Sequence, residues 1–188
     1  MIDLSIKPVE IKRIEAALGS KAKQVPRKVA SAVNKTATRT KGFMAKEVSK
    51  ELALTQKNIK STISIPERAT PKNNSVKIVL RETKKIPLRD YGARQTKRGV
   101  SYKISRQGSR KLVKGAFQGP TPDIRKASWR NRVFARVGES RLPIVQLYGP
   151  SPWGAFNKNK MRRPVLKLAK KQLRKELAEQ VRRIKLSV

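Results

Sequence analysis

The candidate functional side chains of this sequence are its lysines and arginines. They are densest between residues 83 and 138. This stretch carries 16 of them against two acidic residues, a net charge of +14. Alternate residues of a β-hairpin lie on one face, so basic residues alternating with neutral ones predict a charged projection. The candidate positions are Arg94, Lys97, Arg98, Lys103, Arg106, Arg110, Lys111 and Lys114.

Contact with phosphate groups is the chemistry that such a surface supports. It requires positive charge and reach, and its affinity comes from the release of counterions from the nucleic acid. Acidic faces of neighbouring proteins would satisfy the same charges, and a solvated or subunit-facing loop is the plain alternative. Sequence-specific readout is not expected, because no helix-turn-helix, zinc-finger or basic-zipper signature is present.

Residues suited to catalysis or metal binding are scarce. The sequence has no histidine and no cysteine, which removes histidine-activated nucleophiles, histidine-based metal sites and thiolate metal sites. Only Asp90 and Asp123 lie between Glu82 and Glu139, too few acids for a two-metal nuclease, and turn or capping roles explain them. No glycine-rich phosphate loop is present. We therefore expect a protein that is not an enzyme and that uses no cofactor or metal.

The charge of the whole chain calls for an acidic partner. Its 188 residues include 47 lysines and arginines against 12 acidic residues, a formal net charge of +35. Such a charge repels itself in any compact state, so nucleic acid, an anionic membrane surface or acidic proteins must neutralise it. We expect the isolated chain to be less ordered than the bound one. The sequence shows no signal-peptide pattern and no apolar run near the ~20 residues that span a bilayer, which favours synthesis in the cytoplasm.

Residues 1–65 have the periodicity of helices. A short amphipathic helix is expected to end near Gly19, and Thr55 is placed to cap another short helix that contains Ile59 and Ile63. Between them, a long helix is predicted over residues 26–53, with an inward stripe at about four-residue spacing. That stripe consists of Val29, Val33, Ala37, Met44, Val48 and Leu52.

Residues 75–150 alternate apolar and polar side chains, which is typical of half-buried strands. The candidate strands are SVKIVLRE, GVSYKIS, KLVKGAF, RVFARV and PIVQLY. Glycines between these runs suit the turns of a meandering antiparallel sheet. The basic residues between 94 and 114 would then lie on a hairpin of that sheet.

Residues 158–186 predict a basic amphipathic helix with Pro164 in its first turn. Its apolar stripe is narrow and has no aromatic residue, which argues against binding to a membrane surface. The stripe consists of Leu166, Ala169, Leu173, Leu177, Val181 and Ile184. These segments together predict an α+β fold in a single domain over residues 1–188, with N-terminal helices, a central antiparallel β-sheet and a C-terminal helix.

One segment interrupts the basic pattern. From Leu142 to Phe156 no residue is charged, and its prolines and glycines make a stiff exit from the last strand. Aromatic anchors in a charge-depleted patch are typical of subunit contacts, whereas packing on the chain's own core is the alternative. The candidate contact residues are Leu142, Ile144, Leu147, Tyr148, Pro150, Pro152, Trp153 and Phe156.

The order of these features resembles a known family. N-terminal helices are followed by VPRKVASAVNKTATRTKGFMAKEVSKELAL, a hyper-basic strand region with KGAFQ, the run RVFARVGESRLPIVQLYGPS and a basic terminal helix. This arrangement is similar to that of the minor tail protein Z family, the tail completion proteins of lambda-like tailed phages and prophages. The similarity covers nearly the whole chain and is most specific at residues 115–117 and 136–144.

The resemblance implies a non-enzymatic virion protein at the head-proximal end of the tail. It also implies a homo-oligomeric ring, a hexamer because tails are built on six-fold symmetry, that completes the tail and helps to place the genome end for ejection. The implied partners are the tail terminator, the major tail protein, the head–tail connector and double-stranded viral DNA in the channel. From the residues alone, a ribosomal or other RNA-binding protein and a non-specific DNA-packaging protein remain alternatives.

Overall fold

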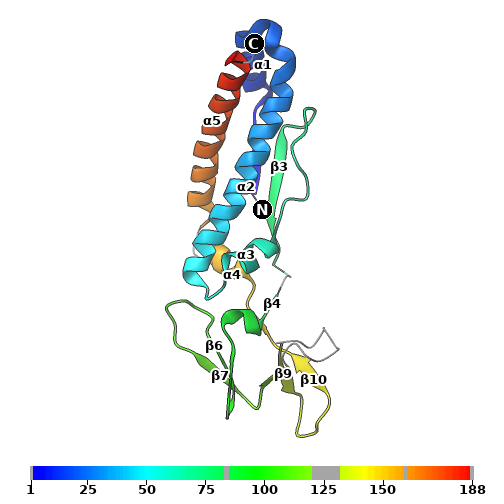
Figure 1. The fold of residues 1–188 in the computed structure, drawn as a ribbon, viewed down its shortest axis with the longest axis vertical. Coiled ribbons are helices and arrows are strands. Elements are labelled where there is room, and N and C mark those ends of the chain that lie inside the picture. Colours follow the sequence, from blue (N-terminus) through cyan, green and yellow to red (C-terminus); the bar gives the residue numbers. More distant parts are fainter. Residues whose placement is uncertain (1, 83–84, 120–131, 159–160, 187–188) are drawn as a thin grey trace. The chain divides into compact units, whose positions relative to one another are not determined.

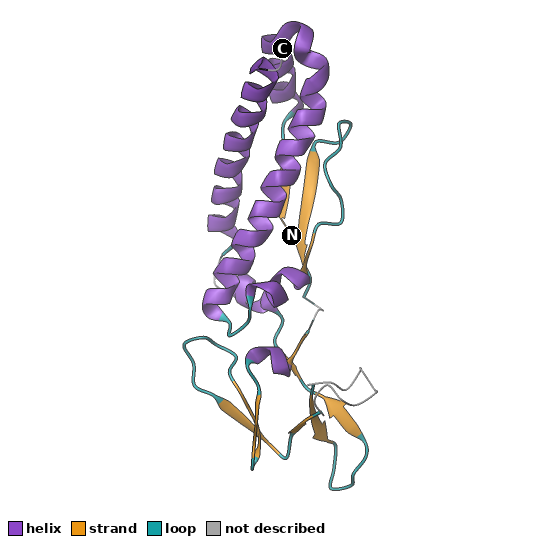
Figure 2. Cartoon of the chain, in the orientation of Figure 1, coloured by secondary structure: helices purple, strands orange, loops and turns teal. Residues whose placement is uncertain are grey.

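The computed structural model describes residues 2–82, 85–119, 132–158 and 161–186, and the chain divides into two compact units (Figure 1). The helical unit comprises Met1–Met44, Ile63–Leu80 and Asn159–Val188, and the strand-rich unit comprises Ala45–Thr62 and Arg81–Lys158. The long helix α2 (Val25–Glu51) contributes residues to both. Helices and antiparallel strands both occur (Figure 2), which confirms the predicted α+β class.

A small antiparallel sheet lies in the helical unit. Its strands are β1 (Ile2–Ser5), β2 (Ile63–Ser64) and β3 (Ser75–Leu80), in the order β1-β3-β2. The predicted alternation holds in β3, where Val76, Ile78 and Leu80 are buried. Ile2 pairs with Ile78, so buried residues of the two strands share one face.

The N-terminal helices form where the sequence predicts them. Helix α1 (Pro8–Leu18) ends at Gly19, which has a positive φ of 52° and leads into the 3-10 turn η1 (Gly19–Gln24). Helix α2 then follows and ends at Glu51, two residues before the predicted end. Every residue of the predicted apolar stripe is buried, including Leu52, which lies just beyond the helix. Two threonines of α2, Thr36 and Thr40, are fully buried as well, and the Thr36 hydroxyl donates a hydrogen bond to the carbonyl of Ala32 at 2.8 Å.

The C-terminal helix α5 (Arg162–Leu186) lies alongside α2 and runs antiparallel to it (Figure 1). Ala169, Leu173 and Ile184 are buried as predicted, but Leu166, Leu177 and Val181 are only half-buried. Two polar residues, Glu176 and Gln180, occupy the inward face instead. Arg39 of α2 makes this possible, because its guanidinium forms an ion pair with the Glu176 carboxylate.

The strand-rich unit contains several small antiparallel sheets in place of one continuous meander. One has the order β5-β6-β7, a second β10-β9-β8 and a third β11-β4. The strands are β4 (Ile86–Pro87), β5 (Arg94–Thr96), β6 (Gly99–Tyr102), β7 (Lys111–Lys114), β8 (Phe117–Gln118), β9 (Val133–Arg136), β10 (Ile144–Gln146) and β11 (Tyr148–Gly149). Their core is the cluster of Leu88, Val100, Ala116 and Val133.

Short helical elements complete this unit: α3 (Gln56–Thr62), the 3-10 turn η2 (Leu88–Tyr91) and α4 (Pro152–Lys158). The predicted cap of α3 is confirmed, since the Thr55 hydroxyl accepts a hydrogen bond from the backbone N–H of Asn58 at 3.3 Å. Ile59 is buried within α3, whereas Ile63 lies beyond the helix end and in β2.

Replacing Arg39 with glutamine is expected to lower the free energy of unfolding by about 1–3 kcal/mol. The Glu176 side chain is 8% exposed, and without Arg39 its carboxylate keeps only the 3.1 Å hydrogen bond from the Gln172 amide. Arg174→Gln is the matched control, because Arg174 is an exposed arginine of α5 with no ion pair in the described part of the chain. Chemical denaturation followed by circular dichroism measures both, and equal losses would contradict the assigned role of Arg39.

Candidate nucleic-acid interface

Strands β5, β6 and β7 form the antiparallel meander that carries most of the predicted basic residues. Val100 pairs with Gln95 on one side and with Val113 on the other, and Val100 faces the core cluster. Residues adjacent to these in each strand point to the opposite, outer face. Arg94 and Lys114 lie on that outer face, together with Ser101 and Leu112.

A two-residue turn joins β5 to β6, and it consists of Lys97 and Arg98. Gly99 follows the turn with φ +144°, and a Cβ atom there would lie 2.1 Å from the carbonyl oxygen of Val113. Glycine is therefore required for β7 to approach this turn. The backbone N–H of Gly115 donates to the carbonyl of Arg98 at 3.2 Å, which keeps both turn cations beside the end of β7.

Arg110 joins the outer face and is held there by the backbone. Its guanidinium donates to the carbonyl oxygens of Gly92 and Ser101, at 2.6 Å and 2.9 Å, and to the Ser101 hydroxyl at 3.2 Å. These bonds use one edge of the guanidinium and leave its charge in place. Arg94, Arg110 and Lys114 therefore share the outer face, and Lys97 and Arg98 lie in the turn at its edge. We call these five of the eight predicted cations the meander face: Arg94, Lys97, Arg98, Arg110 and Lys114.

No carboxylate forms an ion pair with these five cations in the part of the chain that the structure describes. All five residues are exposed. The meander face spans about 13 Å along the four-residue strands and about 10 Å across three strands. Exposed cations without ion-pair partners are the kind of groups that attract phosphates at low ionic strength.

The other three predicted cations lie elsewhere. Lys111 lies opposite Tyr102 in the strand register, and both residues are on the other face of the meander. Lys103 and Arg106 belong to the loop between β6 and β7, which is fixed to the end of α2 by a bond from the Ala53 N–H to the Ile104 carbonyl at 2.8 Å. Positive charge near a helix C-terminus is stabilising, so these two cations can stabilise the end of α2.

The sequence predicted a turn or capping role for Asp90. Asp90 lies in the 3-10 turn η2 and lines a pocket with Lys103 and Arg106. Burial raises the pKa of its carboxyl group, and the neighbouring Arg89 opposes that rise. Asp123 lies outside the described residues. No cluster of three acidic residues suited to a metal ion occurs in the ranges that the structure describes.

The neutral segment 142–156 divides into exposed and buried residues. Leu142 is 65% exposed and Tyr148 is 47% exposed. Pro150 is exposed, while Ile144 and Trp153 are half-buried. Two exposed apolar residues of the same region, Val137 and Val145, were not among the predicted contacts. The alternation of side chains along a strand could have identified Val145, because its side chain lies on the face opposite to those of Ile144 and Gln146.

The remaining predicted contacts serve the chain's own core. Leu147 packs against the cluster around Val133, and Pro152 and Phe156 are buried. The sequence predicted a stiff loop at this point. That prediction is wrong for Trp153 and Phe156, because both residues belong to α4. Ser151 precedes the helix and its hydroxyl accepts a hydrogen bond from the Trp153 N–H at 3.3 Å, so the prolines around it start a helix in place of an extended exit.

Tyr91 anchors the neutral segment to η2. Its side chain is fully buried, its ring lies against Gly149, and its hydroxyl donates to the carbonyl of Pro150. Burial raises the pKa of this hydroxyl, and the charge of Asp90 adds to the rise. The exposed residues on either side of Gly149 are thereby presented from a fixed backbone.

The comparison with protein families identifies the chain. A family model described as prophage minor tail protein Z (GPZ) matches residues 11–186. The chain belongs to this family. No curated protein and no solved structure matches it.

Membership in the minor tail protein Z family defines the general role. The chain is a structural component of a phage tail and therefore of the virion. In the described helices, no stretch combines the length and the apolar character needed to cross a membrane. The resemblance stated from the sequence order is confirmed.

Replacing Gly149 with alanine is expected to destabilise the strand-rich unit by about 1–3 kcal/mol. The added Cβ atom would lie 2.2 Å from Cε2 of Tyr91, so the ring or the strand must move. Gly138→Ala is the control, because a Cβ atom there meets no heavy atom within 4 Å. Thermal unfolding followed by tyrosine and tryptophan fluorescence measures both variants, and unchanged stability of Gly149→Ala would refute the tight Tyr91 contact.

Proposed function

We propose that this protein completes the head-proximal end of the phage tail as a hexameric ring and contacts the phosphate backbone of the genome DNA through its meander face. One observation carries the proposal: the five exposed cations of the meander face form no ion pair with any carboxylate in the described part of the chain. Family membership supplies the tail context. Through this contact the protein would hold the genome end in position for ejection, next to the tail terminator, the major tail protein and the head–tail connector.

The dimensions of the meander face support a duplex as its partner. Double-stranded DNA carries about one negative charge per 1.7 Å of helix axis. A length of about 13 Å of duplex therefore carries about eight phosphate charges with both strands counted, more than the five cations of the face neutralise. Each cation can engage a phosphate without a defined base sequence, which suits a protein that must accept any genome end.

Subunit contact within the ring is assigned to the exposed apolar residues of the neutral segment. Leu142 and Tyr148 are the strongest candidates among the predicted residues, and Val137 and Val145 extend the same region. Apolar residues without charge are what close association of a chain with net charge +35 requires. Heterologous contacts of this kind generate a closed ring when the rotation between copies is one-sixth of a turn.

Removing two cations from the meander face tests the DNA contact. Lys97→Gln/Lys114→Gln is expected to reduce the slope of log affinity against log salt by about 1.8 for a 20-base-pair duplex, because each phosphate contact contributes about 0.9. Lys57→Gln/Lys60→Gln is the matched control, since both lysines are exposed residues of α3 in the same unit. Fluorescence anisotropy between 50 and 300 mM NaCl gives the slopes, and equal slopes for the two double variants would disprove the contact.

Adding a negative charge at the apolar surface tests the ring. Leu142→Asp and Tyr148→Asp are expected to leave a monomer at concentrations where the unchanged protein associates, because a carboxylate at a desolvated contact is costly. Val9→Asp is the control, because Val9 is 60% exposed on α1 and belongs to the helical unit. Analytical ultracentrifugation measures the masses. Normal association of both variants would exclude the neutral segment as the subunit contact.

A further inference from the structure

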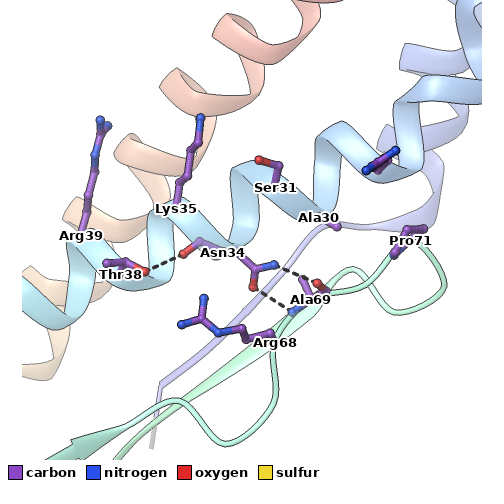
Figure 3. Close-up of a pocket in the computed structure, with 10 residues that line it drawn as sticks. Ala30, Ser31, Asn34, Lys35, Thr38, Arg39, Arg68, Ala69 and Pro71 are labelled. Atoms are coloured by element: carbon purple, nitrogen blue, oxygen red, sulfur yellow. Dashed lines mark hydrogen bonds between the residues drawn. The ribbon is translucent and has the colours of Figure 1, made fainter.

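A second basic surface lies in the helical unit, along the exposed side of α2 (Figure 3). It is an open groove of about 710 Å³ between the helix and the segment that connects β2 to β3. Its floor is formed by small and polar residues of α2, namely Ala30, Ser31, Asn34 and Thr38. The cations that line it are Arg27, Lys35, Arg39 and Arg68.

Asn34 builds this groove by fixing the connecting segment to the helix. Its side-chain amide donates to the carbonyl of Ala69 at 2.8 Å, and its side-chain oxygen accepts from the N–H of Ala69 at 2.9 Å. Ala69 is buried by this contact. Arg68 is thereby held beside α2, while Lys35 and Arg39 project from the other side of the helix (Figure 3). Cations therefore border the floor on both sides.

Among the described residues that line the groove there is no carboxylate. Glu67, the acid next to Arg68 in the sequence, forms an ion pair with Lys77 at 3.4 Å. Arg39 is partly neutralised by Glu176. Arg27 and Arg68, in contrast, have no ion-pair partner in the described ranges.

A neighbouring groove between α2 and α5 is also basic, but acids partly neutralise it. It shares Lys35 and Arg39 but also contains Glu176 and Glu179. Both acids are engaged. Glu176 forms an ion pair with Arg39, and Glu179 accepts a hydrogen bond from the Arg183 guanidinium at 3.0 Å, which lowers the pKa of Glu179. The groove that Arg27 and Arg68 line differs from it in offering an external anion cations with no acid among the described lining residues.

We infer that the groove lined by Arg27 and Arg68 binds the phosphate backbone of nucleic acid, at a site separate from the meander face. The lining favours phosphates over an acidic protein. Protein contacts rely on aromatic and large apolar anchors in desolvated pockets, whereas the apolar residues in the described lining of this groove are Ala30, Ala69 and Pro71. Arginine suits phosphate because its planar guanidinium donates two parallel hydrogen bonds to the oxygens.

The length of the groove matches several phosphates in succession. From Arg27 to Arg39 the helix rises about 18 Å at 1.5 Å per residue. One strand of a duplex advances about 3.4 Å per phosphate, so about five phosphates pass along this length. The hydroxyl of Ser31 has no partner among the described residues, so it is available on the floor as an additional donor.

The test uses the full-length protein, a 20-base-pair duplex and fluorescence anisotropy over a range of NaCl concentrations. Arg27→Gln/Arg68→Gln is expected to reduce the salt slope by about 1.8. Arg13→Gln/Arg174→Gln is the control, because it removes the same charge from two exposed arginines of the helical unit outside both grooves. Arg68→Lys keeps the charge and is expected to keep the slope. Circular dichroism confirms that each variant is folded.

Equal slopes for the groove and control variants would overturn the inference. Loss of binding to a poly-glutamate peptide with unchanged DNA binding would also overturn it, because the groove would then recognise acidic protein. The same measurements in a Lys97→Gln/Lys114→Gln background separate the two sites. A further loss of slope there supports the groove even if the meander face proves not to bind DNA.

Discussion

Uncompensated positive charge is the constraint on which the rest of this molecule depends. In the described residues, the carboxylates that form ion pairs are Glu47, Glu67, Glu176 and Glu179, against 47 lysines and arginines in the sequence. Burying an unpaired charge costs several kcal/mol. In both units the described cations are not buried, and Glu176 of the helical unit, the one buried charged residue among those described, is paired with Arg39.

The exposed cations differ in how far the fold itself uses them. Arg110 fixes the meander through backbone carbonyls, and Lys103 and Arg106 lie at the end of α2, so these residues contribute to folding as well as to charge. Arg27, Arg68, Lys97 and Lys114 have no such contacts in the described structure, and their charge is open to an external anion. A structural tail protein of this composition gains stability from any polyanion that binds only its folded form.

Local sequence signals predicted the elements well, because their causes are local. Gly19 ends α1, Thr55 caps α3, and the four-residue spacing from Val29 to Val48 fixes the buried face of α2. Alternation and glycines suited to turns predicted β6 and β7 of the meander, whereas β5 was not among the predicted strands. These features depend on backbone geometry within a few residues, so periodicity and capping rules suffice to find them.

Features that depend on distant contacts could not be predicted in this way. Glu176 faces the α2 helix only because Arg39, 137 residues earlier in the chain, reaches its carboxylate. The groove on α2 exists because Asn34 binds the backbone of Ala69, which no spacing rule connects to it. Phe156 is in a helix and buried, although the prolines before it suggested an exposed stiff loop. In each case tertiary packing decided what local preference left open.

The most direct measurement is the unfolding temperature of the full-length protein as a function of ionic strength and of added duplex DNA. If self-repulsion of the net charge of +35 limits stability, raising NaCl from about 20 to 500 mM must raise the unfolding temperature, since the Debye length falls several-fold over this range. A short duplex at low salt must raise it further. An unfolding temperature that responds to neither salt nor DNA would contradict the account.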